Sequence, residues 1–132
     1  MSDSWAAGIA AITLFVESLG DARRFYQEVF GLPVVFEDEN SAVFRFGETL
    51  INLLDAAEAP GLVEPAAVAS PGAGVRFQFT IEVEDVDAMC EELRRRGVEL
   101  LNGPIDRDWG VRTAAFADPD GHVWEVAGKI PD

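Results

Sequence analysis

The stretch that decides the fold runs from Ala114 to Val126 and reads AAFADPDGHVWEV. Two short apolar runs flank the turn signal DPDG at positions 118–121, in which proline presets φ and glycine supplies a positive φ. Both runs are β-prone and alternate, so the stretch predicts a β-hairpin. The returning strand places the carboxylate of Glu125 among apolar neighbours, where a carboxylate is rarely buried unless it is paired or binds something. The simpler interpretation is that Glu125 lies at the rim of the sheet with its carboxylate in water.

The composition is that of one globular domain. The chain has 132 residues, of which 48% are hydrophobic, and this is enough for a core of its own. Twenty-four acidic residues against ten basic ones give a net charge of −14. This balance argues against nucleic acid as a partner, because phosphates need a basic surface. It is compatible with a cationic ligand, although acidic surfaces usually serve only solubility.

The chain carries no sequence signal for a membrane or for export. No apolar run approaches the roughly 20 residues that a membrane span needs. The N-terminal sequence MSDSW has neither the basic region nor the apolar core of a signal peptide. The one cysteine, Cys90, cannot form a disulfide within the chain. We therefore expect a cytoplasmic protein that does not interact with a membrane.

The first half of the chain predicts the order β-α-β-β-β. Apolar residues recur at helical spacing over residues 19–30, with Ser18 as the N-cap and Gly31 just after the C-terminus. The apolar runs around this helix predict strands, at residues 12–16, 33–36, 42–46 and 49–54.

A different composition follows in residues 55–74, which hold three prolines, three glycines and seven alanines. No core periodicity is visible there, so the segment predicts a linker or a long loop, with a short helical turn around Leu62.

The second half predicts the same order of elements. Residues 76–83 alternate strictly between apolar and polar side chains, which is typical of a strand. Asp85 is a suitable N-cap for a helix over residues 86–96, and Gly97 closes it. Three further β-prone runs predict strands, at residues 98–101, 111–116 and 122–127.

The two halves are copies of one module. TLFVESL at 13–19 aligns with TIEVEDV at 80–86 at an offset of 67, and residues 47–53 align with 121–126 if one residue is gapped, which places Asn52 over Glu125. The repeat predicts a single α+β domain of two tandem β-α-β-β-β modules that form a curved mixed sheet around a cleft, with one helix on one face of each module. Module 1 spans residues 9–54, the linker 55–74 and module 2 75–128.

With these paired modules, the chain resembles the vicinal oxygen chelate superfamily. This superfamily contains glyoxalase I, extradiol dioxygenases, fosfomycin-resistance enzymes and bleomycin-resistance binding proteins. The resemblance covers about residues 9–128 and implies the glyoxalase/bleomycin-resistance/dioxygenase fold. It rests on LFVESL at 14–19, FY at 25–26, FGL at 30–32, WGVR at 109–112 and FADPDGHVWE at 116–125.

The resemblance also implies where a metal would bind. In metal-dependent members, four side chains from the first and last strands of the modules hold a divalent ion, and the matching positions here are Ala11, Asn52, Gln78 and Glu125. Ala11 offers no donor atom, and the two amides offer only neutral oxygens. We therefore expect no metal cofactor, or at most a weakly held divalent ion. Extradiol dioxygenase chemistry needs two histidines and a carboxylate, and the single histidine, His122, cannot supply them.

Convergent polar groups with aromatic neighbours are expected on the cleft face that no helix covers, as in small-ligand sites. Simpler interpretations pair Arg76 with Glu82, place Trp109 in the core at the end of the sheet and make Arg112 a rim charge. The expected set consists of Thr13, Phe15, Asn52, Arg76, Gln78, Thr80, Glu82, Trp109, Arg112 and Glu125.

We expect a homodimer that binds a small organic ligand, similar to a resistance or sequestration protein. The alternative is a glyoxalase-like lyase or isomerase, either metal-dependent or using Glu125 as general base. A third class is a structural or regulatory dimer that binds no ligand.

Overall fold

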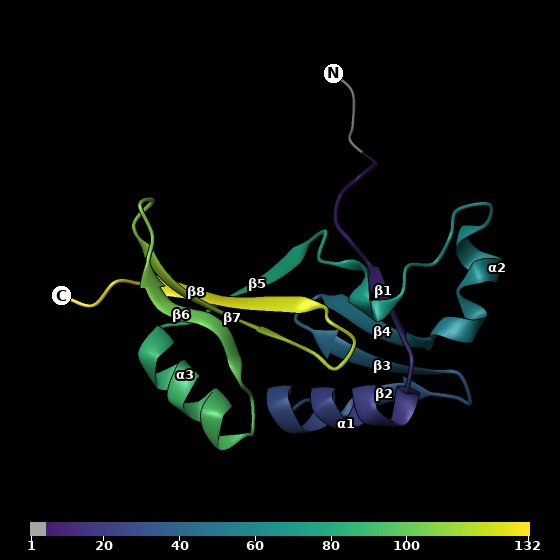
Figure 1. Cartoon of the computed structure of the whole chain (residues 1–132), viewed down its shortest axis with the longest axis horizontal. Helices are drawn as coiled ribbons and strands as arrows, with labels where there is room; N and C mark the ends of the chain where they lie inside the picture. Colours follow the sequence, from purple (N-terminus) through teal and green to yellow (C-terminus); the bar gives the residue numbers. More distant parts are fainter. Residues whose placement is uncertain (1–4) are drawn as a thin grey trace. The chain divides into compact units, whose positions relative to one another are not determined.

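The computed structural model describes residues 5–132, and residues 1–4, which belong to the N-terminal stretch considered for an export signal, lie outside the described residues (Figure 1). The chain divides into two compact units, the first ending at Val68 and the second beginning at Ala69. Each unit contains a four-stranded mixed sheet and has the order β-α-β-β-β, so the α+β class and the repeat are confirmed.

The first unit has the strand order β1-β4-β3-β2, with β1 parallel to β4 and the other pairs antiparallel. Its helix begins where the Ser18 hydroxyl accepts a hydrogen bond from the Asp21 backbone at 3.3 Å, and it ends before Gly31, whose φ is 69°. The elements are β1 (Ala11–Val16), α1 (Leu19–Phe30), β2 (Val34–Glu37), β3 (Ser41–Phe46) and β4 (Thr49–Asp55).

The core of the first unit lies between α1 and one face of its sheet. Buried Tyr26 of α1 packs against the ring of Phe44 on β3, with ring centroids 5.8 Å apart, and Phe30 packs against Phe46 at 5.1 Å. The aromatic residues at helical spacing thus contact the sheet, and α1 also buries Ala22 and Val29.

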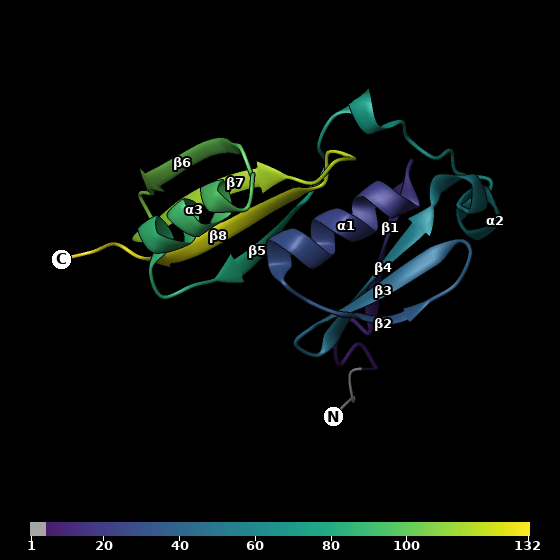
Figure 2. The same cartoon turned by 90° about the horizontal axis from the view of Figure 1, so that it is seen from below.

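The second unit repeats this arrangement with the strand order β5-β8-β7-β6 and β5 parallel to β8. Figure 2 shows α3 lying along one face of this sheet. The elements are β5 (Gln78–Glu82), α3 (Val86–Arg95), β6 (Leu100–Asp106), β7 (Val111–Ala117) and β8 (Val123–Lys129).

The largest difference from the sequence prediction is the length of β6. The predicted strand ended at residue 101, whereas β6 continues to Asp106 through Gly103 and Pro104. The sequence hides this continuation because glycine and proline usually end a strand. Proline is tolerated here because β6 is the edge strand and its pairing with β7 is irregular at this point.

The predicted helical turn near Leu62 is confirmed by α2 (Pro60–Val63). Two 3₁₀ turns lie on either side of it in the chain, at Ala56–Glu58 and Pro71–Ala73. Among the described residues, no helix combines the length and the apolarity needed to cross a membrane.

Strand register is the same in both units. In the first, Thr13 of β1 lies beside Asn52 of β4, and in the second, Thr80 of β5 lies beside Glu125 of β8. The alignment of Asn52 with Glu125 in the sequence therefore corresponds to equivalent positions in the two sheets.

Gly128 on β8 has no Cβ, and this allows the segment between β5 and α3 to lie directly against β8. The Val83 backbone donates a hydrogen bond to the Ala127 carbonyl at 2.9 Å. A Cβ at residue 128 would lie well inside van der Waals contact with the Val83 carbonyl oxygen and 3.2 Å from Cγ2 of Val86. A side chain at this position would push α3 away from the sheet.

We predict that Gly128→Ala lowers the free energy of unfolding by about 1–3 kcal/mol, the usual cost of overpacking. Gly20→Ala in α1 is the matched control, because nothing lies within 4 Å of the added Cβ. It should be neutral or stabilising by up to about 1 kcal/mol, since alanine favours a helix. Urea unfolding measures both, and equal effects would contradict the close approach.

Candidate functional site

The two faces of the second sheet are distinguished by contacts with α3. Arg112 of β7 lies beside Gly128 of β8, and this pair faces Val86 and Asp87 of α3. Because side chains alternate along a strand, Glu125, which lies three residues before Gly128 on β8, is on the opposite face. We call this the open face of the second unit. Its members are Gln78, Thr80, Glu82, Thr113, Ala115, Ala117, Val123, Glu125 and Ala127, of which Thr113, Ala115 and Val123 are buried.

Glu125 and Thr80 are joined directly on the open face. The Thr80 hydroxyl donates a hydrogen bond to Oε1 of Glu125 at 2.9 Å. Parallel pairing of β5 and β8 places the two residues side by side, so the contact needs no loop. The hydroxyl orients the carboxylate and leaves its second oxygen available to another donor.

The charge on this face is negative and is not balanced by a neighbouring cation. Within residues 5–132, no arginine, lysine or histidine lies within ion-pair distance of Glu82 or Glu125. Glu125 is half-buried, and Ala115 lies beside it on β7. A partly desolvated carboxylate of this kind favours a positively charged partner.

Arg112 does not belong to this group, because its side chain lies on the face that α3 covers. Its guanidinium donates hydrogen bonds to Asp106 at 2.7 Å and to Asp87 at 2.8 Å. The hydrogen bond from Arg112 lowers the pKa of the Asp106 carboxyl. Arg112 therefore connects β6, β7 and the first turn of α3. It is neither a group of the predicted cleft nor a lone rim charge, because Asp87 and Asp106 both pair with it.

Two other residues of the predicted set also stand apart. Arg76 precedes β5 and is exposed, and it cannot pair with Glu82 because the two positions are six residues, about 20 Å, apart along an extended chain. Trp109 lies in the loop between β6 and β7 and is 71% exposed, so it is not part of the core. The guanidinium of Arg107 lies 6.0 Å from its ring centroid, a cation–π contact.

The remaining predicted residues form an equivalent face in the first unit. Phe44 and Ile51 face α1, so Asn52 and its neighbour Thr13 point to the side that α1 leaves uncovered. Phe15 and Ala11 lie on this same side of β1. Oδ1 of Asn52 is buried and has no hydrogen-bond partner among the described residues. An orphaned carbonyl oxygen of this kind is costly unless something donates to it.

Sequence reasoning missed the pairing of Asp118 with His122. Nδ1 of His122 lies 2.8 Å from Oδ2 of Asp118, whose side chain is fully buried. The ring of His122 also stacks on Phe77, with centroids 6.2 Å apart. The only sequence signal is the spacing D-P-D-G-H, which places the two side chains four residues apart across a turn.

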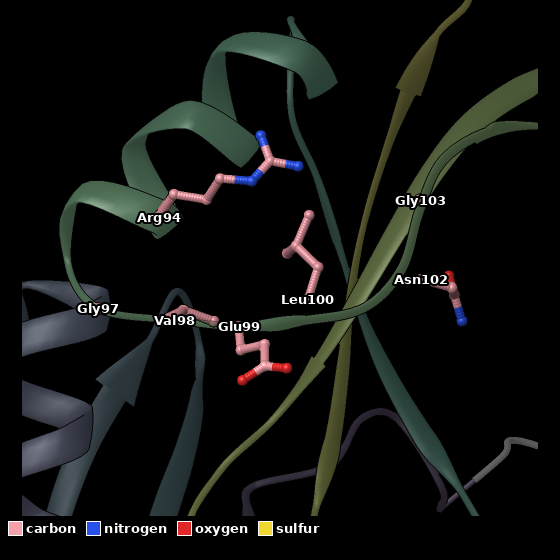
Figure 3. A pocket seen from close by; sticks show the side chains of 7 residues that line it. All are labelled: Arg94, Gly97, Val98, Glu99, Leu100, Asn102 and Gly103. Atoms are coloured by element: carbon pink, nitrogen blue, oxygen red, sulfur yellow. The ribbon is translucent and has the colours of Figure 1, made fainter.

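A hollow of about 570 Å³ lies elsewhere on the second unit, between the end of α3 and β6 (Figure 3). It is wide and shallow, and its polar lining groups include Arg94, which pairs with Glu91 on the helix surface at 3.2 Å. None of the predicted site residues lines it. We favour the open face as the candidate site because it carries the hydrogen-bonded Thr80–Glu125 pair, whereas Arg94 of the hollow is already paired with Glu91.

Comparison with known proteins places these features in a family. The family model of the Glyoxalase/Bleomycin resistance protein/Dioxygenase superfamily matches residues 8–126. The uncharacterized protein YraH from Bacillus subtilis is 35% identical over 119 residues, which cover 87% of this chain and 93% of YraH. Metallothiol transferase FosB from Staphylococcus haemolyticus is 27% identical over 129 residues, covering 95% and 86% of the two chains.

Solved structures show the same fold. A glyoxalase/bleomycin resistance protein/dioxygenase from Nocardioides has a TM-score of 0.86 at 24% identity, covering 97% of this chain and 87% of its own. TnmS3, an antibiotic binding protein from Streptomyces sp. CB03234, has a TM-score of 0.73 at 25% identity and covers 97% and 100%. The repeated module, its motifs and these similarities agree, and the chain belongs to the glyoxalase/bleomycin resistance protein/dioxygenase superfamily, whose fold is that of the vicinal oxygen chelate proteins.

Proposed function

We propose that the chain binds and sequesters a small organic molecule that carries a positive charge, and that the open face of the second unit receives it. The observation that carries this proposal is the Thr80–Glu125 pair. Its carboxylate is oriented, half-buried and without a cation partner among the described residues. Glu82 adds a second negative charge on the same face of β5. A net charge of −14 attracts cations over longer distances.

The first unit, taken by itself, has a face of its own that suits an apolar group with a hydrogen-bond donor. Asn52 is surrounded there by Phe15, Val43 and Leu54, which lie on the same side of their strands. A donor on a ligand would satisfy the buried Oδ1 of Asn52. Ligand sites of mostly apolar character with a few placed polar groups are the usual pattern for small molecules. The similarity to an antibiotic binding protein, TnmS3, agrees with this class of ligand.

The four positions that hold a metal in metal-dependent relatives do not fit a metal here. Ala11 ends in a methyl group, and the amide of Gln78 is exposed. Glu125, the single carboxylate, already accepts a hydrogen bond from Thr80. The described residues contain no group of three or more histidine, cysteine, aspartate or glutamate side chains suited to an ion. One carboxylate and two neutral amides give a divalent ion little charge compensation.

The competing function is a glyoxalase-like lyase or isomerase in which Glu125 acts as general base. The same Thr80–Glu125 pair favours it, because a half-buried carboxylate held by a hydroxyl is positioned to accept a proton. The family also contains enzymes such as metallothiol transferase FosB, to which this chain is similar. Binding and turnover of Glu125 variants separate the two functions.

We predict that the protein purified without chelator contains far less than one equivalent of zinc, nickel, manganese or iron, because the donor set is incomplete. Plasma mass spectrometry measures the content, and Glu125→Gln should leave any residual metal unchanged. Stoichiometric metal that is lost in Glu125→Gln would overturn the binding-protein proposal and favour the lyase.

We predict that Glu125→Gln weakens binding of a cationic compound by about 2–5 kcal/mol, the scale for removing one member of a buried charge pair. The compound is chosen by thermal-shift screening of cationic aromatic amines against neutral analogues of the same size, and its affinity is measured by calorimetry. Glu82→Gln is the matched control, because it removes the same charge from the same face without breaking the bond to Thr80.

An enzyme would respond differently to the same variants. Glu125→Gln would keep binding the compound and lose turnover, measured as lactoylglutathione formation from methylglyoxal and glutathione. If the substitution changes neither binding nor turnover, Glu125 is a rim residue and the site is wrongly assigned.

We also propose a homodimer with twofold symmetry, the commonest oligomer symmetry. Supporting it, the edge strands expose large apolar side chains, namely Val35 and Phe36 on β2 and Leu101 and Ile105 on β6. Uncovered edge strands are an aggregation hazard, which a second copy would remove. Light scattering at micromolar concentration should give twice the chain mass of 14.3 kDa, and a monomer would contradict the proposal.

A further inference from the structure

The turn between β7 and β8 is closed by a buried carboxylate that the proposed function does not use. Oδ1 of Asp118 accepts hydrogen bonds from the backbone of Asp120 and of His122, both at 2.9 Å. Oδ2 lies 2.8 Å from Nδ1 of His122. The backbone adds a bond from Asp118 to the His122 carbonyl at 2.9 Å. One side chain thus holds the whole turn, residues 118–122.

The His122 ring connects this turn to the start of β5. It stacks on Phe77 at an angle of 19°, and Phe77 contacts Phe79 with centroids 5.0 Å apart. Phe79 in turn contacts Trp124 of β8 at 4.8 Å. The row of rings therefore links the turn to the first residues of both β5 and β8, the strands that carry Thr80 and Glu125.

Negative charges dominate the surroundings of His122. Asp118 and Asp120 lie near it within its own turn. The residue that packs on its ring, Phe77, carries no charge. Arg76, next to Phe77, forms no ion pair with either aspartate within the described residues. Burial alone would lower the pKa of His122, but the hydrogen bond that its ring donates to Asp118 and the charges of both aspartates outweigh it and raise the pKa above the ordinary value.

We propose that the charge of His122 controls how firmly the β7–β8 turn and the first residues of β5 are held. When the imidazole is charged, its bond to Asp118 is charge-assisted and the turn stays closed. When it is neutral, Nδ1 still donates to Asp118, but the bond weakens and the turn opens more often. The response needs no ligand, so it stands or fails independently of the proposed function.

The direction with pH follows from the raised pKa. The stabilisation from the charged ring is fully present below the ordinary histidine pKa of about 6.5 and is lost as pH rises through the higher pKa of the folded protein. The turn should therefore loosen as the pH rises above about 6.5 and through this higher pKa. His122 is the single histidine of the chain, so one ring signal reports its titration.

The test is amide hydrogen exchange by NMR at pH 6.0 and 8.0, with each rate divided by the intrinsic rate at that pH. We expect protection of residues 78–82 and 120–125 to fall roughly three- to tenfold between these pH values, the size expected when a charge-assisted bond becomes a neutral one. Protection in α1 should not change and serves as the internal reference. Constant protection of the turn in the wild-type protein would overturn the proposal.

Two variants separate the parts of this mechanism. His122→Gln should abolish the pH dependence in both segments, and the same fall in this variant would overturn the proposal. Phe77→Leu should keep the pH dependence in residues 120–125 and remove it from 78–82, and an unchanged response of β5 would overturn the role of the ring stack. Should His122→Gln fail to fold, Asp118→Asn provides the same comparison, with weak protection of the turn expected at both pH values.

Discussion

The parallel pairing of the first and last strands in each unit is the constraint on which the candidate site depends. Backbone hydrogen bonds fix the register of β1 with β4 and of β5 with β8. This register places a threonine beside a hydrogen-bond acceptor in both units, Thr13 beside Asn52 and Thr80 beside Glu125. Because one helix covers only one face of each sheet, these polar pairs lie on the other face without disturbing the core.

The second unit uses its charged residues differently on its two faces. On the helix-covered face, Arg112 is neutralised by Asp87 and Asp106, so its charge stabilises the junction of β6, β7 and α3. On the open face, Glu125 has a hydroxyl donor but no cation within the described residues. Charged side chains are therefore paired on the face that α3 covers, whereas the carboxylate on the other face has only a hydroxyl partner within the described residues, which is the basis of our proposal.

Membership in the superfamily defines the fold but leaves the chemistry open, because one fold carries many functions. A relative such as FosB is named as a metallothiol transferase and a neighbour such as TnmS3 as an antibiotic binding protein. In this chain a methyl group, two neutral amides and one carboxylate occupy the four positions, which give a divalent ion little charge compensation, and this is why we favour binding over metal-assisted catalysis.

The sequence by itself determined the elements, the repeat and the family. Apolar periodicity, Ser18 and Gly31 defined α1, and alternation defined the strands, because these signals act over a few neighbouring residues. The alignment of Asn52 with Glu125 was also predictable, since a repeated sequence adopts a repeated register. The length of β6 was not predictable, because an edge strand tolerates Pro104 only through its irregular pairing with β7. Tertiary structure alone decided that Arg112 faces α3, that Trp109 is exposed and that Asp118 is buried against His122. These outcomes depend on which face of the sheet the helix covers and on how the turn closes. The first arises from contacts between residues far apart in the chain, and the second arises from contacts within a short segment that folds back on itself.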